Sequence, residues 1–296
     1  MFDLKIGFSC NNNCVHCVVA DKRPSGNLDI PHLMKVIEKI PCNEPVQITG
    51  GEPTVYSYLP SLLKTCREMG HETFIQTNGT GFSDSSFLEE CAPYINHIHI
   101  AIHSCSAEVH DRIVQSKGMW DKTMQGWANI RAKGIECSTQ TVLSKYNINT
   151  LYDTFDFIQK VAPGTQMSMT YPHFMGNAYR NREEVAFRYK DYADEIQKTL
   201  KKFKDNVFVE AIPLCYLHPY TDVCRQDGVI LQGAIRDGVD FSSSLDKVNY
   251  NMLDLKDHRK GPLCKRCIYN DECIGVWKEY IEMFGNKLDL FPIEEE

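Results

Sequence analysis

Three cysteines near the start of the chain have the residue type and the spacing to hold a metal centre. Cys10, Cys14 and Cys17 lie in the stretch SCNNNCVHC, directly after an apolar segment. Thiolates are soft ligands that suit zinc or iron–sulfur clusters. Zinc sites usually close with four protein ligands, and His16 is a poor fourth because it lies inside the loop. A cubane held by three cysteines leaves one iron open to chelate a small molecule.

A second group of cysteines lies near the end of the chain, in the string GPLCKRCIYNDEC. Cys264, Cys267 and Cys273 place three thiols within ten residues, which favours an iron–sulfur cluster or a zinc ribbon. A fourth ligand would come from upstream. We favour Cys215, which follows an expected strand, because a strand end holds a ligand more firmly than a loop. Cys224 and a site with one open position remain alternatives.

The composition limits the functional classes. The chain has 296 residues, a net charge of −7 and 13 cysteines. The N-terminus lacks the pattern of a signal peptide, and no apolar run approaches the ~20 residues that a membrane helix needs. We therefore expect a cytoplasmic protein without a membrane anchor, in which clustered thiols bind metal. The acidic balance makes a nucleic-acid partner unlikely.

The elements that must position these residues alternate along the chain. Expected strands are Leu4–Phe8, Pro45–Thr49, Glu72–Thr77, His97–His103, Glu136–Leu143 and Gln166–Tyr171. Expected helices are Ile30–Lys39, Leu59–Met69, Ser85–Cys91, Trp120–Lys133 and Leu151–Val161, followed by one long charged helix over Arg180–Lys204 and a short strand, Val207–Ala211. This alternation predicts an α/β fold, an open partial (β/α)6 barrel over residues 1–205 with a smaller extension over 206–296. Chemistry in such folds lies at the carboxyl ends of the strands.

Two further motifs end the second and third expected strands, GGEPT at 50–54 and TNG at 77–79. Together with the Cys-x-x-x-Cys-x-x-Cys spacing, they resemble the radical S-adenosylmethionine (radical SAM) superfamily. The segment Tyr171–Asn181 also resembles the sixth-strand region of that family. The residues that the resemblance assigns to SAM binding are Gly50, Gly51, Glu52, Pro53, Asn78, His103, Ser138 and Gln140. The physical fit is that glycines permit close backbone approach and a carboxylate attracts an ammonium group.

The resemblance implies a [4Fe–4S] cluster on Cys10, Cys14 and Cys17 that passes one electron to SAM. Cleavage then gives methionine and a 5′-deoxyadenosyl radical, which removes a hydrogen atom from the substrate. An electron donor such as flavodoxin or ferredoxin is expected as a partner. The C-terminal string resembles the auxiliary-cluster domains called SPASM and twitch. Trp277 stands where SPASM would place a further cysteine, so a twitch-like half with one auxiliary [4Fe–4S] cluster is favoured.

The resemblance specifies the machinery rather than the substrate. Peptide modification by crosslinking, oxidation or epimerisation is the first expectation. Dehydrogenation or rearrangement of a small molecule in cofactor or natural-product biosynthesis is the alternative. Cys105, just past the fourth expected strand, is a candidate hydrogen-atom donor, although an inert loop thiol is the commoner case. A zinc-binding module without catalysis is the hypothesis from another class.

Overall fold

The computed structural model describes residues 1–25, 29–224, 257–285 and 289–294. Seven parallel strands form one sheet in the order β1-β2-β3-β4-β5-β6-β7. The strands are β1 Phe2–Lys5, β2 Val46–Thr49, β3 Thr73–Thr77, β4 His97–Ala101, β5 Glu136–Val142, β6 Met167–Thr170 and β7 Val207–Glu210. β1 and β7 stand at opposite ends of this order, so the described sheet does not close into a barrel.

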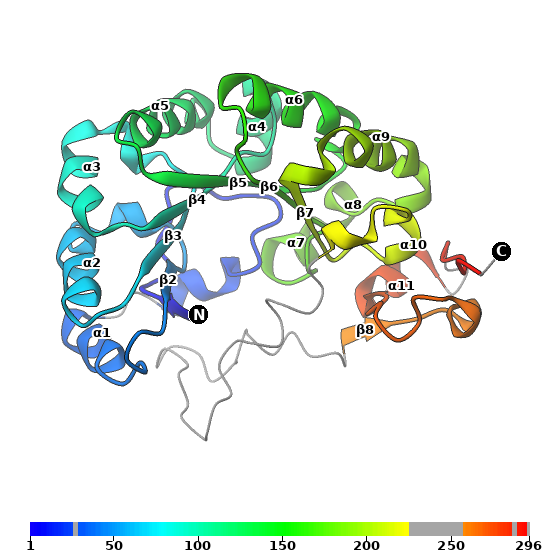
Figure 1. Ribbon diagram of the computed structural model, residues 1–296, viewed down its shortest axis with the longest axis horizontal. Helices are drawn as coiled ribbons and strands as arrows, with labels where there is room; N and C mark the ends of the chain where they lie inside the picture. The colour runs from blue at the N-terminus through cyan, green and yellow to red at the C-terminus, as the bar shows by residue number, and fades with distance from the viewer. Residues whose placement is uncertain (26–28, 225–256, 286–288, 295–296) are drawn as a thin grey trace.

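Helices cover the outer face of the curved sheet (Figure 1). The main helices are α1 Ile30–Ile37, α2 Leu59–Glu68, α3 Ser85–Cys91, α4 Ala107–Val114, α5 Met119–Ala132, α6 Leu151–Val161 and α9 Ala193–Phe203. Apolar residues spaced three or four apart place one buried stripe on each helix, as with Leu33 and Ile37 of α1. In β4, Ile98 and Ile100 are fully buried, whereas His97 and His99 alternate with them on the other face.

The long charged helix expected over Arg180–Lys204 is wrong, because the helical path breaks between Val185 and Ala193. Two short helices, α7 Gly176–Arg180 and α8 Arg182–Val185, come first, and α9 begins only at Ala193. Between α8 and α9 the chain buries Phe187 and Tyr189, which are 1% and 0% exposed. The Tyr171 hydroxyl donates a hydrogen bond to the Phe187 carbonyl at 2.9 Å. Burial of these aromatic rings outweighs the helix propensity of the charged residues around them.

The sheet continues past the expected boundary at residues 205/206. β7 pairs in parallel with β6, with Met167 opposite Val207, so the short strand expected over Val207–Ala211 is the seventh strand of the sheet. After β7 come α10 Leu214–Leu217, the two-stranded sheet of β8 His258–Arg259 and β9 Val276–Trp277, and α11 Lys278–Phe284. Residues 225–256, 286–288 and 295–296 of the expected extension lie outside the described part of the chain.

Candidate active site

The loop after β1 carries the first three cysteines and is pinned to its surroundings by backbone hydrogen bonds. The Asn13 and Val15 amides donate to the carbonyls of Val114 and Ile113 at the end of α4, both at 2.9 Å. Within the loop, the Cys17 amide donates to the Cys14 carbonyl at 3.1 Å. The loop is therefore held in one shape by backbone partners as well as by side-chain packing.

Helix α7 holds the same loop from the other side, which sequence reasoning missed. The Asn177 amide nitrogen Nδ2 donates to Asn13 Oδ1 and to the Cys14 carbonyl, both at 3.0 Å. The Asn181 side chain donates to the Val15 carbonyl at 3.0 Å. At Gly176, with φ at +53°, an added Cβ would lie 2.6 Å from the Cys17 carbonyl oxygen. The only sequence signal was the polar GN pair within the Tyr171–Asn181 segment.

The two glycines after β2 allow the cysteine loop to lie directly on the strand end. A Cβ added to Gly50 would stand 2.2 Å from the Gly7 carbonyl oxygen, and one added to Gly51 would stand 2.2 Å from the Ser9 carbonyl oxygen. The Gly51 amide donates to the Gly7 carbonyl at 2.8 Å, and the Glu52 amide donates to the Ser9 carbonyl at 2.9 Å. These contacts explain the residue type at both positions.

Glu52 joins the ends of β2 and β3 through a buried carboxylate that is 1% exposed. Its Oε1 accepts hydrogen bonds from the Thr54 amide at 3.0 Å, the Thr54 hydroxyl at 2.7 Å and the Thr77 hydroxyl at 2.5 Å. Its Oε2 accepts from the Asn78 amide at 2.7 Å. Burial raises the pKa of Glu52, and these four donors oppose the shift. Glu52 therefore positions both sequence motifs relative to each other.

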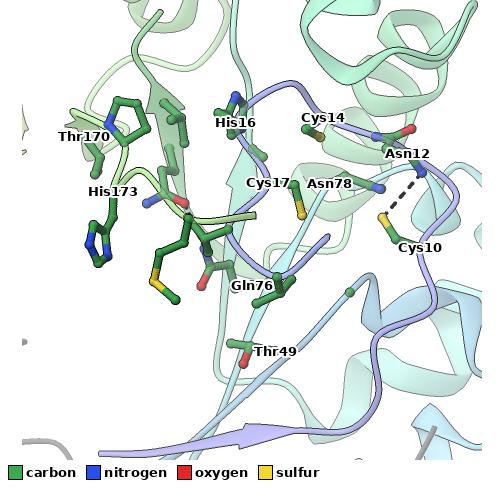
Figure 2. Close-up of a pocket in the computed structure, with 18 of the residues that line it drawn as sticks. Cys10, Asn12, Cys14, His16, Cys17, Thr49, Gln76, Asn78, Thr170 and His173 are labelled. Atoms are coloured by element: carbon green, nitrogen blue, oxygen red, sulfur yellow. Dashed lines mark hydrogen bonds between the residues drawn. The ribbon is translucent and has the colours of Figure 1, made fainter. Parts of the chain in front are cut away.

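One cavity of about 450 Å³ opens at the carboxyl ends of the strands and collects most of the expected site. Cys10, Cys14, Cys17, Gly50, Gly51, Glu52, Asn78, His103 and Gln140 all line it. Figure 2 shows the three cysteines on one loop, facing Thr170 and His173 across the cavity. Gln140 is held by an amide chain, because its Oε1 accepts from Gln76 at 2.9 Å and Gln76 accepts from Gln47 at 3.1 Å.

Three residues expected in the first site do not line this cavity. Ser138 lies deeper in the sheet, where its hydroxyl is 2.7 Å from both His97 Nε2 and His99 Nδ1. Pro53 begins a short 3₁₀ turn and is buried. Cys105 lies past β4, with its amide donating to the Thr154 hydroxyl at 3.2 Å. The hydrogen-atom donor role of Cys105 thus has no support from its position.

The cavity wall beside the cysteines carries polar atoms without a hydrogen-bond partner among the described residues. Both side-chain amide atoms of Asn12, Nδ1 of His16 and Nε of Arg23 are of this kind. Arg23 also places Nη2 4.0 Å from the Cys17 sulfur, and Asn12 is 2% exposed. Buried polar groups normally have partners, so this wall fits a polar ligand beside a thiolate-bound cluster. Asn12 and Arg23 were not singled out from the sequence, and His16 was weighed there only as a metal ligand.

Two histidine side chains, His16 and His103, line the cavity next to the cysteine loop. The rings of His16 and His103 meet edge to face with centroids 4.7 Å apart. His103 Nδ1 accepts a hydrogen bond from the Val142 amide at 3.3 Å, so a neutral ring carries its proton on Nε2. Burial lowers the pKa of His16 to about 4 and that of His103 well below its usual range. Burial therefore favours the neutral form of both rings.

A second, smaller cavity, about 20 Å³ in volume, brings together the other cysteines. Cys215, Cys264, Cys267 and Cys273 all line it, whereas Cys224 is not among its lining residues. Cys267 accepts a hydrogen bond on sulfur from the Ile293 amide at 3.4 Å. Burial raises the pKa of Cys215 to about 12, and the neighbouring thiols add to this shift. Among the described residues, no three Cys, His, Asp or Glu side chains converge closely enough for a single metal ion.

The segment Cys273–Trp277 separates the two cavities. Cys273 and Gly275 line the small cavity, while Ile274 and Trp277 line the large one. Trp277 stacks on His173 with ring centroids 4.1 Å apart. The second group of cysteines therefore lies directly behind one wall of the first site.

Several known proteins are similar to part of this chain in sequence. The S-adenosylmethionine-dependent nucleotide dehydratase of Lacinutrix mariniflava is 34% identical over 112 residues, which is 35% of this chain and 23% of that protein. The probable GTP 3′,8-cyclase of Sulfurisphaera tokodaii is 22% identical over 233 residues, 74% of each chain. The first three curated relatives are matched over 23–40% of their own length.

Solved structures agree on the fold. Streptococcus suis SuiB bound to the precursor peptide SuiA superposes with a TM-score of 0.59 at 16% identity, over 75% of this chain and 51% of SuiB. The enzyme anSMEcpe with bound AdoMet and a peptide gives a TM-score of 0.58 at 14% identity, over 71% of this chain and 63% of that chain.

No helix among the described residues has the length and apolarity to cross a membrane. Residues 4–158, more than half of the chain, match the Radical SAM superfamily, so this protein belongs to that superfamily of enzymes, which use SAM and a [4Fe–4S] cluster.

Proposed function

We propose that this enzyme holds a [4Fe–4S] cluster on Cys10, Cys14 and Cys17, reductively cleaves SAM in the large cavity, and abstracts a hydrogen atom from a peptide substrate. The observation that carries the proposal is that one cavity brings together the three thiols and residues of the GGEPT and TNG motifs. Polar atoms of Asn12 and Arg23 that have no hydrogen-bond partner lie beside them. The cluster and SAM together supply the radical. The protein's own residues shape the loop, orient the ligand and keep the surrounding imidazoles neutral.

The auxiliary site is the second part of the proposal. Four cysteines, Cys215, Cys264, Cys267 and Cys273, would saturate a second [4Fe–4S] cluster, with Cys215 rather than Cys224 as the upstream ligand. Their shared cavity supports this ligand set. A cubane spreads its thiolates over a wider space than a single ion does, because four irons lie between them. With β7 counted in the sheet, the part of the chain that serves this site begins after Glu210.

Two substrate classes have specific support. Peptides come first because SuiB and anSMEcpe, which share the fold, were solved with peptides bound, and because the PqqA peptide cyclase of Ruegeria pomeroyi is 26% identical over 137 residues. A small molecule such as a nucleotide is the second candidate, because the match to the GTP cyclase runs over 74% of both chains.

Anaerobic reconstitution tests the machinery. The wild type should bind about eight irons and form 5′-deoxyadenosine with SAM and dithionite. A Cys10/Cys14/Cys17→Ala variant should keep about four irons and form none. Colourless protein with stoichiometric zinc would refute the proposal and leave the zinc-binding module.

A low-molecular-mass cell extract tests the substrate class. If the substrate is a peptide, the extract should stimulate deoxyadenosine formation, and protease treatment of the extract should abolish the stimulation. Stimulation that survives protease, or that pure GTP reproduces, would instead support the small-molecule alternative.

A further inference from the structure

Exposed hydrophobic side chains lie on the segments that surround the small cavity. Eight large hydrophobic side chains are exposed among the described residues, and three of them belong to this region. They are Leu263, Ile268 and Phe291, which are 47%, 46% and 45% exposed. Monomeric proteins tolerate isolated exposed hydrophobic residues, but a group of them beside a cofactor site is typical of a recognition surface.

These side chains are contiguous with the cysteines. Leu263 lies in the same 3₁₀ turn as Cys264, Pro262–Arg266. The Ile268 amide donates to the Ile293 carbonyl at 2.8 Å, which ties the turn to the segment that carries Phe291. Phe291 and Lys260 line the cysteine cavity and are also exposed to solvent. The cavity thus lies directly beneath the surface.

One stretch of this surface is basic, whereas the whole chain carries a net charge of −7. From 259 to 267 the sequence RKGPLCKRC has four cations and no carboxylate. Lys260 donates to the Asn270 carbonyl, and Arg266 lies 3.5 Å from Glu294 with both side chains more than half exposed. Asp271 directly follows Asn270, and Glu294 is on the segment that carries Phe291, so carboxylates border these cations. We call Lys260, Leu263, Lys265, Arg266, Ile268 and Phe291 the rim surface.

We propose that the rim surface docks a small acidic electron-carrier protein, which delivers electrons on the side of the auxiliary site. Exposed apolar side chains next to Lys260, Lys265 and Arg266 fit a carrier whose redox group is surrounded by carboxylates, in the small contacts typical of electron-transfer pairs. The carrier loses one electron, and the reductive cleavage of SAM to methionine and the 5′-deoxyadenosyl radical consumes it. The segment Cys273–Trp277 is then the route between the docking side and the large cavity. This inference rests on the proposed function.

The test compares two reductants on the reconstituted holoenzyme without added substrate. Reduced flavodoxin needs a docking surface, whereas dithionite is a small anion that does not. Lys265→Glu/Arg266→Glu reverses two rim charges, and Lys35→Glu/Lys39→Glu makes the same change on and just after α1, where both lysines are exposed and distant from the rim. Deoxyadenosine formation is measured with each reductant, and the Kd for flavodoxin is measured by fluorescence anisotropy at 20 and 300 mM NaCl.

The rim variant should lose about tenfold or more in flavodoxin affinity at low salt and in the flavodoxin-driven rate, and keep the dithionite-driven rate. The Lys35→Glu/Lys39→Glu control should keep both, and wild-type affinity should fall with salt because exposed charges are screened. Equal flavodoxin affinity in all three proteins would overturn the docking proposal while leaving the function intact. Absence of deoxyadenosine with dithionite in the wild type would instead refute the proposed function. If the rim variant binds less iron, the milder variants Lys265→Gln and Ile268→Ser replace it. Weaker flavodoxin binding by them supports docking at the rim surface, and an unchanged Kd for flavodoxin overturns it.

Discussion

Replacing Asn177 by alanine should weaken the cysteine loop without touching a cluster ligand. Asn177 is 8% exposed, and its Nδ2 donates to Asn13 Oδ1 and the Cys14 carbonyl at 3.0 Å each. Each such hydrogen bond contributes about 1 kcal/mol net, so the variant should lose about 2 kcal/mol of unfolding free energy. For a chain of 296 residues that loss corresponds to a fall in Tm of about 3 °C.

Asn129→Ala is the matched control. The Asn129 side chain also donates two hydrogen bonds, to the carbonyls of Phe82 and Ser83. It accepts one from the Gln125 side chain. Asn177 likewise accepts one, from Arg180. Both variants should show a similar fall in Tm by differential scanning fluorimetry. Only Asn177→Ala should bind less iron on reconstitution and lose the dithionite-driven deoxyadenosine signal. Equal iron content in the two variants would refute the role assigned to Asn177 in shaping the loop.

Three further predictions concern the strand ends, the histidines and the auxiliary ligands. Gly51→Ala should abolish iron binding at the first site because its Cβ would meet the Ser9 and Phe8 carbonyl oxygens at 2.2 and 2.6 Å, whereas Gly134→Ala, with open space around the Cβ, should not. Burial, and secondarily His97, lowers the pKa of His99 to about 4 from 6.5, so the stability that a neutral His99 contributes should be lost as pH falls from 6.5 towards 4. Urea unfolding should show this loss as about 3 kcal/mol of unfolding free energy in the wild type, and the His99→Gln variant should not show it. Parallel pH profiles of the two proteins would contradict the assignment. Cys215→Ser should reduce the iron content from about eight to about four, and Cys224→Ser should leave it unchanged; the reverse result would move the fourth ligand to Cys224.

The strands and the motif ends were predictable from the sequence because they depend on local patterns. Alternating apolar residues specify β4, and glycine at 50 and 51 indicates close backbone approach, although the partner turned out to include the protein's own Gly7–Ser9. The interruption of the helix after Val185 was not predictable, because the surrounding charged residues have good helix propensity. The burial of Phe187 and Tyr189, which breaks the helix, leaves no signal in the local sequence.

The residues that support the site could not be predicted from the sequence for a different reason. Arg23 has no local signature, and the GN pair at 176–177 does not say which loop it contacts, because both roles depend on which segments meet in space. Ser138 shows the converse, since a polar residue on the right strand bonds to His97 and His99 instead of reaching the cavity. Ser138 and Gln140 are two residues apart on β5 and share one face of the sheet, so position along the strand decides which of them reaches the cavity.

The hold of α7 on the cysteine loop also sets an order of events during synthesis. The loop leaves the ribosome before its anchors, because Asn177 and Asn181 are separated from Asn13, Cys14 and Val15 by 163 to 166 residues. Chains grow from the N-terminus at about 5–20 residues per second, so the loop waits on the order of ten seconds for its anchors. Iron delivered to a nascent chain would meet unrestrained thiols. Loading of the first site is therefore expected to follow translation, on a chain that has already folded past residue 181.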